Sequence, residues 1–154
     1  MNADASSGAP GHAPRRASFS IAASLDDLSL VAQALKAFIS RRVPAIDRDS
    51  IELAVVEAVT NVIKHGYPSG TAGVAEISYE EHEHGVTVEI HDRGRPIPAS
   101  ALEQADGSVF GFDPADTASL PESGMGLSLI KASFDEVHYK TENGLNRLIL
   151  YKKC

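Results

Sequence analysis

Apolar residues recur along the chain with two different periods, and the period predicts which segments form helices and which form strands. Residues 18–23 alternate between apolar and polar, with Phe19 and Ile21 on one face, which indicates a first strand. Apolar positions at helical spacing follow Ser24, so we expect a first helix that begins there and runs to about Arg42.

A second helical pattern begins at Asp47 or Asp49 and continues to about His65, where Gly66 and Pro68 are expected to end it. At 3.6 residues per turn, its apolar side chains cover about one half of the helix circumference. These side chains belong to Ile51, Val55, Val56, Ala58, Val59, Val62 and Ile63. The pattern is typical of a helix that packs one face on a core.

Alternation returns later in two pairs of segments, each joined by a short turn. The four strands are expected at residues 74–80, 86–90, 137–141 and 145–152. His84-Gly85 separates the first pair, and Asn143-Gly144, a strong hairpin signal, separates the second. A third helix is expected over residues 126–134.

The predicted order is strand, helix, helix, two strands, a long loop, helix and two strands. It indicates an α+β fold, a two-layer sandwich with a mostly antiparallel sheet and helices on one face. Residues 1–17, rich in Ala, Ser, Gly and Pro, are expected to be a disordered tail before a domain at 18–154. The aperiodic stretch at about 98–123 is expected to act as a lid.

Composition narrows the class of protein. The 154 residues are 43% hydrophobic and 23% charged, as in an ordinary soluble domain. The formal net charge of −7, without a basic run, argues against direct binding to nucleic acid. No apolar run of about 18 residues predicts a membrane span. Cys154 is the single cysteine, so no internal disulfide can form, which fits a reducing compartment.

A polar stripe lies opposite the apolar half of the second helix and contains Ser50, Glu57, Asn61 and Lys64. Glu57 and Asn61 are one turn apart, so their side chains are neighbours. One interpretation is an ordinary solvent-exposed face. The other is chemical: an Asn oxygen suits Mg²⁺, a Glu can accept a proton, and a Lys can pair with phosphate.

Two short patches follow with similar alternatives. Asp92 and Gly94 stand at a strand end, which fits a simple turn or an acceptor for the exocyclic amine of adenine beside a glycine. Gly124 and Gly126 precede the third helix, which fits a flexible turn or a phosphate-binding helix start. The glycines are neither a P-loop, because no Gly-Lys-Ser/Thr follows, nor a Rossmann turn, because no strand precedes them in a βαβ unit.

The three patches in this order resemble the N, G1 and G2 boxes of the GHKL ATPase/kinase superfamily. The chain is most similar to the RsbW-like anti-sigma factors, the serine/threonine-protein kinases of bacterial partner-switching systems. The resemblance runs from about Ser18 to Lys152. The stretches that carry it are Leu53–Asn61 with Lys64 and His65, Asp92–Pro96, Gly124–Ile130 with Phe134–Val137, and Gly144–Leu150.

The resemblance implies a set of roles. Glu57 matches the general base and Asn61 the Mg²⁺ ligand. The positions matched to ATP binding are Asn61, Lys64, Asp92, Gly94, Gly124, Met125, Gly126 and Leu127. It further implies a cytoplasmic bacterial kinase, active as a homodimer, that phosphorylates a STAS-domain antagonist and sequesters a regulatory partner such as a sigma factor.

Three alternatives accompany this expectation. Many relatives carry an Arg in the first helix, but Leu28–Leu35 has none, which slightly favours a nucleotide-dependent sequestering module without phosphotransfer. The catalytic half of a histidine kinase would need a helix with a phospho-acceptor His, which is not expected before Ser18. A metal site at His82–His84 is the weakest of the three alternatives, because a cluster of His and Glu side chains on a hairpin turn is more typical of solvated surface.

Overall fold

The computed structural model describes residues 15–68, 71–98, 101 and 125–154, which form one sheet with helices packed against it. The strands are β1 (Arg16–Ala22), β2 (Val74–His82), β3 (Gly85–Asp92), β4 (Glu136–Glu142) and β5 (Leu145–Lys153). The helical elements are η1 (Leu25–Asp27), α1 (Leu28–Phe38), α2 (Ala45–Asn61), η2 (Val62–Gly66) and α4 (Met125–Ser133).

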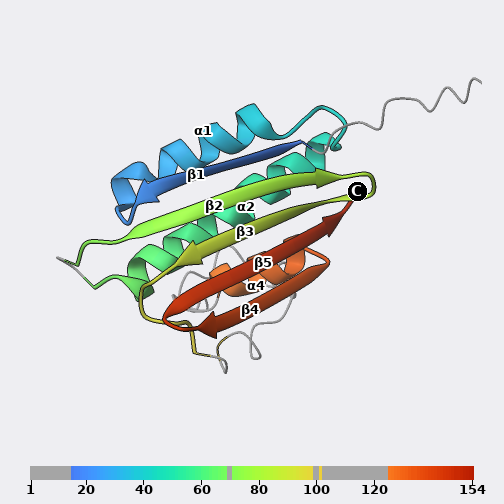
Figure 1. The fold of residues 1–154 in the computed structure, drawn as a ribbon. Coiled ribbons are helices and arrows are strands. Elements are labelled where there is room, and N and C mark those ends of the chain that lie inside the picture. The colour runs from blue at the N-terminus through green and yellow to red at the C-terminus, as the bar shows by residue number, and fades with distance from the viewer. Residues whose placement is uncertain (1–14, 69–70, 99–100, 102–124) are drawn as a thin grey trace, which may run out of the picture.

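The sheet has five strands in the order β1-β2-β3-β5-β4, and every neighbouring pair is antiparallel. Helices α1, α2 and α4 lie on one side of it, and no helix of the described residues covers the other, open face (Figure 1). This arrangement confirms the predicted two-layer α+β sandwich. Because one face is covered by these helices, alternate residues of the three inner strands β2, β3 and β5 are buried.

The first strand and helix form near their predicted positions, but the helix is shorter. Ser24 caps η1, the short turn that leads into α1 at Leu28, since its Oγ accepts a hydrogen bond from the Asp26 backbone N–H at 3.3 Å. Helix α1 ends at Phe38 instead of Arg42, because Ile39 turns to an extended conformation. Ser40 then donates from its backbone N–H and its hydroxyl to the Glu81 carboxylate, both at 2.7 Å.

The second helix is longer than predicted at its start. Helix α2 begins at Ala45, directly after Pro44, whose φ of −53° suits the entry to a helix. At its other end α2 passes into the π-helical turn η2, which ends at Gly66 as expected. All the predicted apolar positions of this helix are buried in the core except Val56, which is partly buried.

The two predicted hairpins are present. Strands β2 and β3 pair with His82 opposite Gly85, and β4 and β5 pair with Glu142 opposite Leu145. In the second turn Asn143 and Gly144 have φ values of 52° and 76°. Both values are positive, which is the requirement of a type I′ turn and the reason an Asn-Gly pair stands there.

Some predicted features lie outside the described residues. Most of the tail at 1–17, nearly all of the lid at 98–123, and Gly124 fall there. Strand β1 begins at Arg16, two residues before its predicted start, because Arg16 pairs with Glu80 on β2 at 2.9 Å. Within the described part of the chain, no helix has the length and apolar character needed to cross a membrane.

Candidate functional site

The polar stripe of α2 faces the start of α4. A Cβ placed on Gly126 would lie 2.9 Å from Asn61 Nδ2 and 3.2 Å from Glu57 Oε2, so both side chains converge on this glycine. Both are partly buried. Among the described residues, neither the Glu57 carboxylate nor the Asn61 amide has a recorded hydrogen bond or ion pair. Because the described residues offer these two polar groups no partner, their oxygen and nitrogen atoms can bind a ligand.

Local sequence explains this convergence. The apolar half of α2 is buried against the sheet, which turns the stripe with Glu57 and Asn61 away from it. Helix α4 packs beside α2, with Leu127 and Ile130 in the core. Gly126, the second residue of α4, is therefore next to the stripe, and its missing side chain gives the space that Glu57 and Asn61 occupy.

Asp92 lies at the end of β3 and is only 6% exposed. Its Oδ1 accepts hydrogen bonds from the Gly94 N–H at 2.9 Å and from Asn146 Nδ2 at 3.0 Å. Within the described residues, no recorded hydrogen bond reaches its Oδ2. The carboxylate is thus held through one oxygen, and the other can accept a hydrogen bond from a ligand.

Asn146 on β5 holds this carboxylate in place. Its side chain is 1% exposed, and Nδ2 donates to Asp92 Oδ1 and, at 2.9 Å, to the Gly94 carbonyl oxygen. Its Oδ1 accepts from the Thr141 hydroxyl at 2.9 Å. Each of these hydrogen bonds joins a donor to an acceptor in only one orientation of the Asn146 amide. Both its nitrogen and its oxygen therefore have partners, as a buried polar side chain requires.

The turn after β3 is tied to the end of η2. The Arg95 N–H donates to the Gly66 carbonyl oxygen at 2.8 Å, and the Arg93 N–H donates to the Tyr67 hydroxyl at 3.0 Å. A Cβ on Gly94 would lie 2.7 Å from the Gly66 oxygen. Sequence reasoning assigned this glycine to the approach of a base, but within the described structure the close neighbour that requires it is the Gly66 backbone.

Helix α2 and its extension connect the two clusters. A Cβ on Gly66 would lie 3.7 Å from Asp92 Oδ1, so the end of η2 touches the Asp92 cluster. Asn61 is five residues earlier, about 7 Å along a helix axis. The structure therefore brings Glu57 and Asn61 to Gly126, and the Asp92 cluster meets the helix at Gly66, about one and a half turns beyond Asn61.

The remaining predicted residues are less informative. Lys64 is exposed on η2, and Leu127 is 8% exposed in the core below the start of α4. Met125 is the first residue of α4, and Gly124 is outside the described residues. No three His, Cys, Asp or Glu side chains of the described residues converge as metal ligands, and His82 Nε2 instead lies 2.8 Å from the Thr87 hydroxyl.

Sequence reasoning missed Asn146 and Gly66. The signal for Asn146 was its place in the alternation, because it points to the same side of β5 as Leu148 and Leu150. A polar residue at a core-facing strand position needs a buried partner, and Asp92 is that partner. Gly66 was interpreted only as a helix stop, and its contact with Gly94 depends on the tertiary fold.

Comparisons with known proteins show the family to which this sequence is similar. Residues 21–152 match the family described as Histidine kinase-like ATPase domain. The chain is 34% identical over 121 residues to an Anti-sigma F factor of Clostridium beijerinckii, covering 78% of this chain and 80% of that protein. It is 32% identical over 99 residues to a Serine-protein kinase RsbW of Halalkalibacterium halodurans, covering 64% of this chain and 59% of that protein.

The fold also matches a solved structure. The crystal structure of the RsbU and RsbW domains of a Mycobacterium tuberculosis protein superposes with a TM-score of 0.56 at 16% identity. The match covers 89% of this chain and 32% of that longer chain. At this identity the likeness concerns the fold.

Proposed function

The chain belongs to the family of histidine kinase-like ATPase domains, and from this membership we propose that it is an ATP-dependent serine/threonine-protein kinase and anti-sigma-type switch protein. Its proposed substrate is a Ser or Thr of a STAS-domain antagonist, and it sequesters a regulatory partner such as a sigma factor. A bacterial cytoplasmic location and a homodimer belong to the same proposal. The names of the two similar proteins support the kinase and anti-sigma parts.

The observation that carries the proposal is the convergence of Glu57 and Asn61 on Gly126. In the proposed reaction the hydroxyl oxygen of the substrate attacks the γ-phosphorus of ATP, and Glu57 accepts the proton of that hydroxyl. The bond between the γ-phosphorus and the β–γ bridging oxygen breaks, which leaves ADP and a phosphorylated substrate. Asn61 Oδ1 would hold Mg²⁺, which when bound neutralises phosphate charge.

The nucleotide is expected to bind between the two clusters. Asp92 Oδ2 would accept a hydrogen bond from the exocyclic amine of adenine, while the Gly94 N–H and Asn146 Nδ2 donate to Oδ1. The start of α4 would meet the phosphates through the backbone N–H groups of Met125, Gly126 and Leu127, with Lys64 as a further cation. Gly124, which is outside the described residues, is assigned to the same role from the sequence. Asn61 and the Asp92 cluster lie at opposite ends of η2, about 7 Å apart along a helix axis, which suits a ligand with a base at one end and phosphates at the other.

A sequestering module without phosphotransfer is the second candidate. The observation that favours it is the lack of an Arg in the stretch Leu28–Leu35, all of it on α1. Such a module would bind nucleotide and a partner through the same surfaces, but Glu57 would have no proton to accept. The two candidates therefore differ in one measurable step.

The deciding experiment is a single-turnover assay with γ-³²P-labelled ATP and a STAS-domain protein recovered from native lysate on the tagged chain. We expect label on a Ser or Thr of that protein, and loss of transfer but not of ATP binding in Glu57→Gln. Glu76→Gln, an exposed acid on the open face of the sheet, is the matched control. Transfer at the wild-type rate by Glu57→Gln would refute the base assignment, and wild-type binding without transfer would establish the sequestering module.

A further inference from the structure

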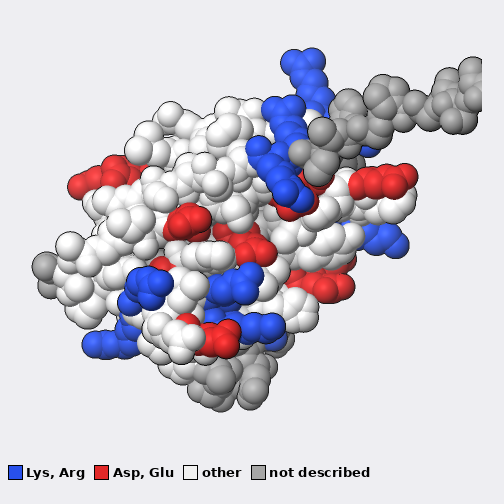
Figure 2. Space-filling view, viewed as in Figure 1, with Lys and Arg blue, Asp and Glu red and all other residues white. Residues whose placement is uncertain are grey.

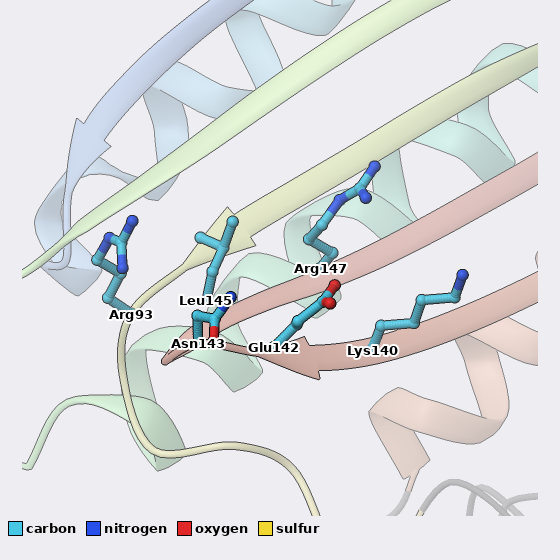
Figure 3. A pocket seen from close by; sticks show the side chains of 6 residues that line it. All are labelled: Arg93, Lys140, Glu142, Asn143, Leu145 and Arg147. Carbon is cyan, nitrogen blue, oxygen red and sulfur yellow. The ribbon is translucent and has the colours of Figure 1, made fainter.

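The open face of the sheet carries a pocket that has no part in the proposed phosphotransfer. Its volume is about 320 Å³, and it lies at the ends of β3, β4 and β5 with the helices behind the sheet (Figure 3). Its lining residues are Arg93, Lys140, Glu142, Asn143, Leu145 and Arg147. Asn146 points to the helix side, so its neighbours Leu145 and Arg147 point to the open face.

Positive charge gathers around this pocket although the chain has a formal net charge of −7. Blue side chains cluster over these strand ends with a red one among them (Figure 2). Lys140 lies directly opposite Arg147 in the β4–β5 register, an unfavourable position for two like charges. The lining contains one acid, Glu142, against three cations, the third of which is Arg93.

The cations differ in how far they are neutralised. Arg147 Nη2 donates to Glu89 Oε2 at 3.1 Å. For Arg93 and Lys140, the described part of the chain offers no side-chain ion pair or hydrogen bond. Arg93 and Lys140 stand on opposite sides of the pocket (Figure 3), and no side chain among the described residues neutralises either of them. Cations placed in this way can each hold one anionic group of the same ligand.

The size and surroundings of the pocket restrict its ligand. At about 320 Å³ it stands at the small end of the range for ligand pockets, roughly 300–1,000 Å³. Glu76 and Glu80 on β2 occupy the open face farther from the pocket, as does Glu136 on β4. They would repel a polyanion that followed the sheet, such as a nucleic acid, so the complementary ligand is short.

We propose that this pocket binds a short acidic segment of a protein partner, with Asp or Glu carboxylates on Arg93 and Lys140. A guanidinium can hold a carboxylate through two parallel hydrogen bonds, and the ammonium adds a second charge contact. Leu145, which is partly buried, offers an apolar contact to the segment. Because the pocket and Glu57 lie on opposite faces of the sheet, this docking is independent of phosphotransfer.

The test measures fluorescence anisotropy of a labelled hexaglutamate peptide with the full chain. We expect binding that Arg93→Ala and Lys140→Glu each weaken by roughly fivefold, the upper range for partly exposed ion pairs. Lys140→Gln serves as a second variant that cannot repel the peptide. Lys36→Glu, at an exposed lysine of α1 that pairs with Glu52, is the control and should bind like wild type.

Each other outcome contradicts the proposal. Equal weakening by Lys36→Glu would mean that the peptide responds to overall charge. Displacement by saturating ADP would place the peptide at the nucleotide site. Displacement by millimolar inorganic phosphate would make the pocket a site for a free anion instead of a docking site. Unchanged binding by the double variant Arg93→Ala/Lys140→Gln would exclude the pocket.

Discussion

Asn146 Nδ2 lies 3.0 Å from Asp92 Oδ1, and this hydrogen bond joins two buried polar side chains 54 residues apart in the chain. The same amide also binds the Gly94 carbonyl oxygen at 2.9 Å. One side chain on β5 therefore sets both the carboxylate at the end of β3 and the turn that follows it. The base-binding part of the proposed site depends on a residue that need not touch the base.

Asn146→Leu should destabilise the fold and weaken nucleotide binding together. The change leaves a buried carboxylate with fewer donors and the Gly94 carbonyl without one of its partners, each a loss of about 1–3 kcal/mol. Urea unfolding and calorimetry with ADP measure the two effects. Ser78→Ala, on the open face of β2, should change neither. Wild-type ADP affinity in Asn146→Leu would show that Asp92 does not need this partner.

Gly126→Ala should separate activity from stability. A Cβ there would lie 2.9 Å from Asn61 Nδ2, which is a movable side-chain atom, so the fold can adjust while the Asn61 amide is displaced. Alanine also favours a helix over glycine by about 1 kcal/mol. We expect phosphotransfer to fall at least about tenfold, with thermal stability unchanged or raised.

Ala132→Gly is the opposite control for that variant. It lies near the end of the same helix and is exposed, so it should lose up to about 1 kcal/mol of stability and keep phosphotransfer. If Gly126→Ala transfers phosphate normally, the convergence on Gly126 has no functional meaning.

Gly94→Ala should be more damaging than Gly144→Ala. At Gly94 a Cβ would lie 2.7 Å from the Gly66 oxygen, a backbone atom that cannot move alone, so we expect a loss of about 1–3 kcal/mol and weaker ADP binding. At Gly144 the space is open and only its φ of 76° opposes alanine, a loss of about 1–2 kcal/mol. Unfolding curves and ADP titration distinguish them, and the turn variant should bind ADP normally.

Glu81 should make the fold sensitive to acid. Burial by itself raises its pKa, but hydrogen bonds from Tyr79 and Ser40 outweigh burial and hold the pKa below its usual value. Because the pKa of Glu81 is lower in the folded state than in the unfolded state, its carboxylate stabilises the fold at every pH above the unfolded-state pKa of about 4.3. This contribution is lost as the pH falls through the folded-state pKa.

Urea unfolding at pH 7 and near pH 3 measures this contribution. We expect Glu81→Gln to be less stable than wild type at pH 7 and the difference to shrink at low pH. Glu83→Gln, an 84% exposed neighbour in the hairpin turn, is the control and should match wild type at both pH values. A difference that does not change with pH would mean that Glu81 acts through packing alone.

Most of the fold follows from local pattern. Alternation located the four later strands, and Asn143-Gly144 located the last turn, because both features depend on residues close in the chain. The ends of the helices were harder. Helix α1 ends at Phe38, where Ile39 becomes extended, and the next residue, Ser40, binds Glu81 from a distant strand. No local sequence feature indicates that contact.

The candidate site divides in the same way. Spacing alone put Glu57 and Asn61 on one stripe of one helix, since four residues make about one turn. Spacing does not say what this stripe faces, and in the structure Gly126 of α4 lies against it. In the same way, Asp92 at a strand end was ambiguous until Asn146 proved to hold one of its oxygens.

The sequence by itself determined the elements, the layer architecture and the residue types available for chemistry, because hydrophobic period and turn composition act over a few residues. The tertiary structure alone decided which of those residues meet. Three contacts join residues from different elements: Gly126 with Asn61, Gly94 with Gly66, and Lys140 with Arg147. Their geometry arises from packing against one sheet, which periodicity does not specify.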